Sequence, residues 1–508
     1  MIKRNKRRAV WASGIVVISV TMVVLMGIVI FVIGRSESLV ASTPTALTTS
    51  ASALSTVIPA NVTTQEDATE SKDHSRGYLT TPAELQRIKA KADRGLEPYR
   101  SAVADVMAWA SKDWNYTLDA NTRCKDRDAN NPMWADNDGG IPILYAKALS
   151  YHLTGDSQYA EQVKDILQKI MTEVKTISID DQQCRINFSW STPEMVASAD
   201  LIEDSWDSAT CTGPLETIYT DTTIGSGNCK ILFQNWLVKN PYYVVSYSMQ
   251  DARSNWGASA TTTAVYIADY LWDRPEVKLI YRNPTQINNG EDIALSPSAS
   301  YVHANKIAIS GMNGYEVEYG SNSSCDLLDG PQQGGGTVPI KSQITENGII
   351  AEDARREEYC NISRYNGEYE NYPQLHIGDT VQQCELMLRR GNRSCYDNVD
   401  NTDIPNYTFV DPNGVTRTTH LYPGRGSIER AIKAIIVDSK TEWKHVSALE
   451  VAYHYYYNHH RLPGFEEWFK YLDGQRPGGC SQDICFGTLT HGFAIGEQPT
   501  LPPTVAPP

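Results

Sequence analysis

Residues 453–460 bring together side chains that can contact sugars or move protons. The segment reads YHYYYNHH, and tyrosine rings offer both an apolar face and a hydroxyl group. A helix turns such a run to all sides, so only one or two of these rings can face a common cleft. His454 and Asn458 share a helix face at i, i+4, but no glutamate or third histidine completes an HExxH zinc pattern. The segment therefore indicates sugar stacking or core packing and no metal site.

Adjacent carboxylates occur at Glu203-Asp204 and at Glu357-Glu358. A glycoside hydrolase needs two carboxyl groups that converge on one glycosidic bond. Neighbouring residues point apart on a helix, so these pairs do not indicate a glycosidase. Three nearby arginines either attract a polyanion or complement the C-terminal dipole of a helix. They are Arg389, Arg390 and Arg393.

The cysteines favour disulfide bonds over metal ligation. All ten lie after residue 34, and none shows the CxxC or CxxH spacing of a zinc site. An even number fits an oxidising compartment. Three close pairs are candidate loop staples, although the sequence leaves their connectivity open. They are Cys211 with Cys229, Cys384 with Cys395, and Cys480 with Cys485. We predict no metal and no cofactor.

Several segments resemble the alginate lyase-like polysaccharide lyase families. They are GGIPILYAKALSYHLTGDSQYAEQVKDIL, WSTPEMVASADLIEDSW, SNWGASATTTAVYIADYLWDRPE, YPQLHIGDTVQQCELMLRRG and SALEVAYHYYYNHHRLPG. The resemblance extends from about residue 80 to residue 470. It implies an all-α fold, an incomplete (α/α) toroid with helical hairpins around a central cleft. It also implies a lyase that cleaves an alginate-like, uronate-containing polysaccharide by β-elimination.

β-Elimination places defined demands on an active site. The enzyme removes the proton at C5 of a uronate and expels the glycosidic oxygen at C4. An amide or a cation must hold the carboxylate oxygens, because negative charge builds on a group that is already anionic. A tyrosine or histidine must take the proton and return it. No metal is required.

The resemblance assigns these roles to two segments that we expect to line one groove. It implies that Asn255, Tyr372, His376 and Arg364 are catalytic, and that Arg253, Trp256 and Gln374 bind substrate. Asn255 would neutralise the carboxylate, and Tyr372 or His376 would transfer the proton. One position departs from the family, because Glu368 stands where relatives carry an arginine, and Arg364 is its nearest replacement.

Each of these residues also has a structural interpretation. Asn255 begins a predicted helix, where asparagine is a good N-cap. Tyr372 precedes a proline and could be a packed loop aromatic. His376 lies one turn into a helix, where a histidine commonly makes a hydrogen bond without acting as a base.

Residues 9–34 predict a transmembrane signal anchor. This uncharged run of 26 residues is long enough for a hydrocarbon layer of about 30 Å and longer than the apolar core of a cleaved signal peptide. The basic segment MIKRNKRR precedes it, so the positive-inside rule predicts a single-pass type II protein. Its large domain would lie outside the cell or in the lumen of the secretory pathway.

The remaining organisation follows from composition and periodicity. We divide the chain into a cytosolic tail (1–8), the anchor (9–34), a Ser/Thr-rich stalk (35–78), the helical domain (79–475), and a disulfide loop with a Pro-rich tail (476–508). Thr81 to Glu84 predicts a capping box before a long helix that ends near Trp109. Helical hairpins are predicted at 141–154 with 157–175, 192–208 with 229–239, and 427–438 with 446–460. Residues 274–345 are expected to form an irregular insertion.

Charge and sequons constrain the partners. The chain has 45 basic and 60 acidic residues and a net charge of −15, which excludes a nucleic-acid backbone binder. We expect an anionic polysaccharide and, through one N-terminal helix, a membrane as partners; no oligomeric state is predicted. Seven sequons follow the anchor and are candidate glycosylation sites. They are at Asn61, Asn115, Asn187, Asn322, Asn361, Asn392 and Asn406.

Two other functions fit the same sequence. A C5-epimerase of a polyuronate or glycosaminoglycan removes the same proton, and a type II anchor with a Ser/Thr-rich stalk is typical of glycan-modifying enzymes. A non-catalytic glycan-binding surface protein on the same scaffold is supported by the departure at Glu368.

Overall fold

A computed structural model describes most of the chain between residues 77 and 502. The described residues are 77–116, 118, 121–122, 139–177, 182–249, 254–281, 292–313, 317–319, 338–340, 350, 353, 371–397, 408–410, 416–418, 427–438, 440–480 and 484–502. Helices dominate this part, which confirms the all-α class. The predicted anchor, 9–34, lies outside it, and none of the described helices is both long and apolar enough to span a membrane.

The first helical segment begins as predicted and ends early. Helix α1 (Pro82–Asp93) has the expected capping box, in which Thr81 Oγ1 accepts from the Glu84 backbone N–H at 3.2 Å and the Thr81 N–H donates to Glu84 at 2.8 Å. The single long helix is wrong. Gly95 adopts a left-handed φ of 77°, which residues with a Cβ rarely adopt, and a second helix, α2 (Tyr99–Ala110), follows.

The first predicted hairpin is confirmed. Helix α3 (Gly140–Thr154) and helix α4 (Ser157–Glu173) are joined by Gly155, which has a φ of 76°, and by Asp156. Asp156 caps α4 by accepting from the Gln158 backbone N–H at 2.9 Å. A left-handed glycine followed by an N-cap residue is a standard way to reverse a helical chain.

Helix α5 (Gln182–Leu201) starts ten residues before the predicted N-terminus at Thr192, and Pro193 lies inside it. Proline has no N–H, so the carbonyl of Ser189 loses its usual helical donor. The hydroxyl of Thr263, from a neighbouring helix, donates to that carbonyl instead. The Thr-Pro signal is therefore misleading here, because a tertiary contact compensates for the missing bond.

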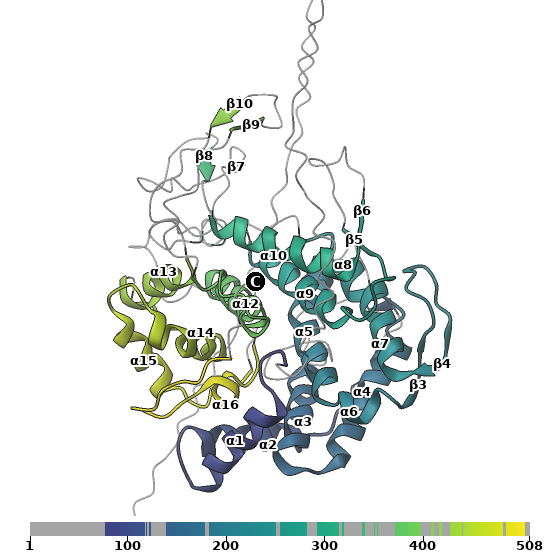
Figure 1. Ribbon diagram of the computed structural model, residues 1–508, viewed down its shortest axis with the longest axis horizontal. Coiled ribbons are helices and arrows are strands. Elements are labelled where there is room, and N and C mark those ends of the chain that lie inside the picture. The colour runs from purple at the N-terminus through teal and green to yellow at the C-terminus, as the bar shows by residue number, and fades with distance from the viewer. Residues whose placement is uncertain are drawn as a thin grey trace, which may run out of the picture. The chain divides into compact units, whose positions relative to one another are not determined.

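Helices from along the described chain pack against one another in a defined order (Figure 1). Helix α9 (Asn255–Tyr270) contacts α5, α10 (Pro297–Asn313) and α12 (Asn371–Arg389). Helix α12 contacts α14 (Val446–His459), which contacts α16 (Gly487–His491). Helix α16 contacts α2, which contacts α3, and α3 contacts α5. These contacts link the first helices of the described chain to the last.

Further helices and short strands complete the described part of the chain. The remaining helices are α6 (Glu203–Trp206), α7 (Cys229–Leu237), η2 (Val238–Tyr242), α8 (Tyr243–Val245), α13 (Ile428–Lys433), η4 (Ala434–Asp438) and α15 (Phe465–Asp473). The strands are β1 (Asn121–Thr122), β2 (Thr176–Ile177), β3 (Thr210–Pro214), β4 (Ile224–Asn228), β5 (Leu279–Tyr281), β6 (Ile293–Leu295), β7 (Val317–Tyr319), β8 (Val338–Ile340), β9 (Thr408–Val410) and β10 (Thr416–Thr418). Strands β1 and β2 pair in parallel. The antiparallel ribbons are β3–β4, β5–β6, β7–β8 and β9–β10, with Cys211 opposite Gly227 in β3–β4.

The other two predicted hairpins have helices at the predicted places. Helices α13 and η4 lie within 427–438 and α14 lies within 446–460. In the remaining hairpin, a β-ribbon, β3–β4, separates α5 from α7. The predicted irregular insertion at 274–345 contains α10, a 17-residue helix that packs on α9. Its residues do have a mixed composition, so the helix was not evident from periodicity alone.

The disulfide predictions are confirmed. Each predicted pair is bonded: Cys211–Cys229, Cys384–Cys395 and Cys480–Cys485. The first closes the β3–β4 ribbon onto α7, and the second ties the middle of α12 to the loop that follows it.

Both predicted ends of the domain shift outward. Tyr78, assigned to the stalk, is 1% exposed and packs against the ring of Tyr266 at 5.0 Å between centroids. At the other end, Phe493 is buried, and Glu497 contacts Lys91 in α1. The chain as far as residue 502 is therefore packed on the helices, because burial of its aromatic and charged side chains holds it there.

The sequons fall into three groups. Asn115 and Asn392 are exposed. Asn187 is 1% exposed within α5 and accepts from Gln183 at 2.8 Å, so the folded chain has no room for a glycan there and this candidate is wrong. The other four lie outside the described residues: Asn61, Asn322, Asn361 and Asn406.

Thr263→Val tests the compensation for Pro193. We expect the free energy of unfolding to fall by about 1–3 kcal/mol, because the buried Ser189 carbonyl loses its donor. Thr261→Val is the matched control, since Thr261 donates only to carbonyls of its own helix, and its loss should be smaller. Chemical denaturation measures both, and equal losses would contradict the interpretation.

Candidate functional site

The structure brings together the two segments that the sequence singled out. Asn255 is the first residue of α9, and its backbone N–H donates to Asp353 Oδ1 at 3.1 Å. Asp353 Oδ2 lies 2.8 Å from Nδ1 of His376, in the second turn of α12. One carboxylate therefore joins the N-terminal parts of two neighbouring helices, whose linked residues are more than 100 positions apart.

Asp353 is the residue that the sequence analysis missed. It occurs in the stretch AEDARREE, where alternating acidic and basic residues are typical of a solvated surface. In the structure its exposure is 0% and that of His376 is 1%. No local pattern marks one carboxylate of this stretch as buried, so only the tertiary fold identifies it.

The geometry assigns the imidazole tautomer. A carboxylate only accepts hydrogen bonds, so the proton of His376 belongs on Nδ1, which donates to Asp353. Nε2 has no hydrogen-bond partner among the described residues and is the atom available for proton transfer. An aspartate that orients a histidine in this way is a common part of acid–base sites.

The other predicted site residues have mixed outcomes. Gln374 is 0% exposed, and its amide donates to the Glu442 carbonyl at 3.0 Å and accepts from the Lys444 N–H at 2.7 Å. Both ends of the amide bond to the backbone at 442 and 444, so Gln374 holds this segment against α12, and its substrate contact stays a prediction. Trp256 and Tyr372 are half-buried and pack against the core.

The arginines of the prediction remain unplaced. Arg253, Arg364 and the departing position Glu368 lie outside the described residues. Among the described residues, no three histidine, cysteine, aspartate or glutamate side chains group closely enough to hold a metal ion.

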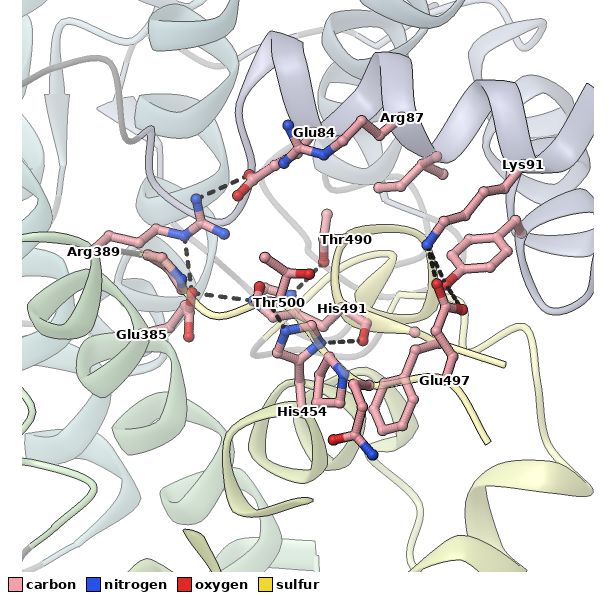
Figure 2. A pocket seen from close by; sticks show the side chains of 17 residues that line it. Glu84, Arg87, Lys91, Glu385, Arg389, His454, Thr490, His491, Glu497 and Thr500 are labelled. Atoms are coloured by element: carbon pink, nitrogen blue, oxygen red, sulfur yellow. Dashed lines mark hydrogen bonds and ion pairs between the residues drawn. The ribbon is translucent and has the colours of Figure 1, made fainter. Parts of the chain in front are cut away.

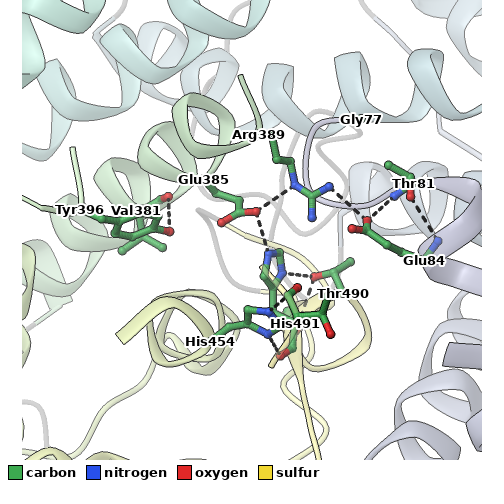
Figure 3. A network of polar contacts seen from close by, with 12 residues as sticks. Gly77, Thr81, Glu84, Val381, Glu385, Arg389, Tyr396, His454, Thr490 and His491 are labelled. Carbon is green, nitrogen blue, oxygen red and sulfur yellow. Dashed lines mark hydrogen bonds and ion pairs between the residues drawn. The ribbon is translucent and has the colours of Figure 1, made fainter. Parts of the chain in front are cut away.

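A second polar cluster lies further along α12 (Figure 3). Arg389 Nε donates to Glu385 at 2.9 Å, and another nitrogen of Arg389 donates to Glu84 of α1 at 3.1 Å. Glu385 also lies 3.2 Å from Nε2 of His491 in α16. His454 of α14 donates from Nδ1 to the His491 carbonyl at 2.6 Å. The cluster thus joins four helices.

Burial and charge shift the pKa values in this cluster. Burial alone would raise the pKa of Glu385, but His491 and Arg389 outweigh it and lower the pKa to about 2. Loss of solvent, with a smaller effect of His491, lowers the pKa of His454 to about 4. At neutral pH, Glu385 is therefore ionised and His454 is neutral.

A cavity of 290 Å³ opens beside this cluster (Figure 2). Its walls come from α1, the first residue of α2, α12, α14, α16 and the chain that follows α16. It includes neither Asn255 nor His376. Glu385 is nine residues after His376 on α12, which is about 14 Å along the helix axis. The described chain therefore has two separate polar sites on one helix.

His454→Gln tests the acid sensitivity of this region. The unfolded chain binds a proton on this histidine below about pH 6.5, whereas the folded chain does so only near pH 4. The free energy of unfolding should therefore decrease as the pH falls through this window, by at most about 1.4 kcal/mol per pH unit from this group. Thermal unfolding at pH 4–7 should show a flatter dependence in His454→Gln.

The exposed His460 provides the control for that experiment. His460→Gln removes one imidazole in the same way and shows the effect of the substitution itself. If His454→Gln has the same slope as His460→Gln, the assignment to His454 is wrong.

No protein family model matches the sequence, and no curated protein matches it at a significant level. The function is therefore argued from the geometry of the Asn255, Asp353 and His376 site.

Proposed function

We propose that the protein is a polysaccharide lyase that cleaves a uronate-containing chain by β-elimination. The observation that carries the proposal is the shared carboxylate, which holds the start of α9 and the His376 ring in one place. These are the segments to which the sequence resemblance assigns carboxylate neutralisation and proton transfer. Nothing in their local sequence requires them to meet.

The chemistry follows from the three side chains. The Asn255 amide donates to the substrate carboxylate and stabilises the charge that develops as the C5 proton leaves. His376 Nε2 takes that proton, and Asp353 stabilises the resulting imidazolium. The C4–O bond then breaks as the C4–C5 double bond forms. The leaving oxygen receives a proton from His376 or from Tyr372, which is one helical turn away on the same face of α12.

The proposal includes an incomplete (α/α) toroid. The order of helix contacts, from α2 through α3, α5, α9, α12, α14 and α16 back to α2, supports this architecture. In such an arrangement, the N-terminal ends of α9 and α12 lie toward one mouth of a central cleft. The uronate chain would enter at that mouth.

Two other candidates have their own support. A C5-epimerase would use the same His376 and Asn255, and the predicted type II topology favours it. A non-catalytic glycan-binding protein is favoured by the exposure of His376, which is only 1%, because a base must be reached by its substrate. The products of the reaction distinguish the three.

The topology carries a separate prediction. If residues 9–34 are a retained signal anchor, protease added to sealed vesicles with the cytosolic face outward should spare the large domain. Detergent should make the same domain accessible, and this is the control for protease activity. Digestion without detergent would overturn the type II assignment.

Asn255→Ala and His376→Asn test the catalytic assignment. Both variants should keep the fold, because Asp353 binds the Asn255 backbone and the asparagine amide at 376 can still donate to Asp353. Each variant should lower kcat by about 100-fold or more, through loss of charge stabilisation or of the base. Activity is measured on a panel of polyuronates by the absorbance of the unsaturated uronate that forms.

Controls separate the alternatives. Gln382→Ala changes another polar residue of α12, one that bonds to Glu194 instead of Asp353, and should retain most activity if it folds. Exchange of solvent tritium into C5 without chain cleavage would identify the epimerase. Binding without either reaction would identify the non-catalytic protein and overturn the lyase.

A further inference from the structure

The 290 Å³ cavity beside α1 is bounded on one side by residues 492–502, here termed the C-terminal strap (Figure 2). The strap is attached to the helices by specific contacts. Glu497 contacts both Lys91 Nζ and the Tyr99 hydroxyl, and the Phe493 carbonyl accepts from Arg476 at 3.2 Å. The cavity is therefore a built space between the helices and a fixed segment.

Most charges that line the cavity are already neutralised. Glu84 and Glu385 are both held by Arg389, and Glu385 also by His491. Glu497 is held by Lys91. These ion pairs fix the orientation of the wall and leave no carboxylate in it without a cationic partner.

Arg87 differs from the other charged lining residues. It projects from the second turn of α1, is exposed, and has no ion pair or hydrogen bond with another described residue. A guanidinium keeps its charge at any physiological pH and binds carboxylate and phosphate groups in a bidentate manner. An anionic group that enters the cavity would therefore be bound most strongly at Arg87.

The rest of the lining suits hydroxyl groups. Gln498 of the strap contributes an amide with no hydrogen bond to another described residue. The Thr490 hydroxyl also lines the cavity, but it is hydrogen-bonded to Nδ1 of His491 at 2.8 Å. Ile88 and Phe493 add apolar surface. A mixture of fixed polar groups and an apolar wall is typical of small-molecule sites, and the volume is at the lower end of their range, near the size of one sugar ring.

We propose that this cavity binds a small hydroxylated organic anion of about one sugar ring, with the anionic group on Arg87 and hydroxyl groups near Gln498. The inference goes beyond the lyase proposal, because the cavity lies about 14 Å along α12 from His376. The anion could be a carboxylate, as in a sugar acid, or a phosphate, as in a sugar phosphate. The two share the charge and the hydroxyl groups that the lining would recognise.

Titration calorimetry on the full-length chain tests the proposal with glucuronate, glucose 6-phosphate and neutral glucose. We expect at least one of the two anions to bind with a Kd of about 1 mM or tighter, and glucose to bind at least about tenfold more weakly. Glucuronate binding alone would identify the carboxylate, and glucose 6-phosphate binding alone would identify the phosphate.

Variants of the lining locate the site. Arg87→Gln should reduce the affinity for the anion about tenfold and remove the preference over glucose. Arg94→Gln makes the same charge change at the exposed end of α1, outside the cavity, and should leave binding unchanged. Gln498→Ala should weaken binding of the anion further when combined with Arg87→Gln.

Two outcomes would overturn the proposal. One is the absence of binding by either anion at about 10 mM. The other is equal affinity in Arg87→Gln and Arg94→Gln, with the fold of both verified by thermal unfolding. His376→Asn separates this site from the lyase site, because it should abolish elimination and leave binding of the small anion intact.

Discussion

Helix α9 is buried along almost its whole length, and its polar side chains must be satisfied by the helices around it. Thr263 donates to Ser189 of α5, and Thr262 donates to the Asp379 carbonyl of α12 at 2.8 Å. At the last turn, Asp269 accepts two bonds from Arg390. A buried polar group without a partner costs several kcal/mol in the worst case, so these bonds set the register of α5, α9 and α12.

The candidate site depends on that register. With α9 and α12 held along their lengths, the N-terminus of α9 and the second turn of α12 lie close enough to share Asp353. The carboxylate adds a further link between the two helices at their N-terminal ends. Its effect is chemical, because it holds the His376 ring in one tautomer.

The other end of α12 is stabilised by charge. The sequence leaves open whether Arg389 and Arg390 form a surface patch for polyanions. In the structure Arg389 is only 3% exposed and the Arg390 side chain 11%. The two form ion pairs with Glu84, Glu385 and Asp269. Such pairs add little net stability over apolar residues, although the loss of one partner costs about 3–5 kcal/mol. Arg389 joins α1 to α12, and Arg390 joins the end of α12 to α9. The strap completes the cavity beside the Arg389 pairs.

The sequence by itself determined the features that are encoded within a few residues. The capping box at Thr81 and Glu84 and the α3–α4 reversal at Gly155 follow from contacts between neighbours in the chain. The spacing of the cysteines also indicated three candidate disulfides, whose pairing the structure decided. The resemblance of scattered segments indicated the helical class and two candidate site segments. The local predictions were correct because the geometry of a few neighbouring residues, and not the rest of the fold, determines a helix cap or a helix reversal.

Only the tertiary structure decided the features that join distant residues. Pro193 stays inside a helix because Thr263 replaces its missing bond, and Gln374 is occupied by the backbone at 442 and 444. Asp353 belongs to the site because it bonds to Asn255 of α9 and to His376 of α12. In each case the partner is about 20 to 100 residues away, and a burial or hydrogen-bond requirement of that kind leaves no mark on the local sequence.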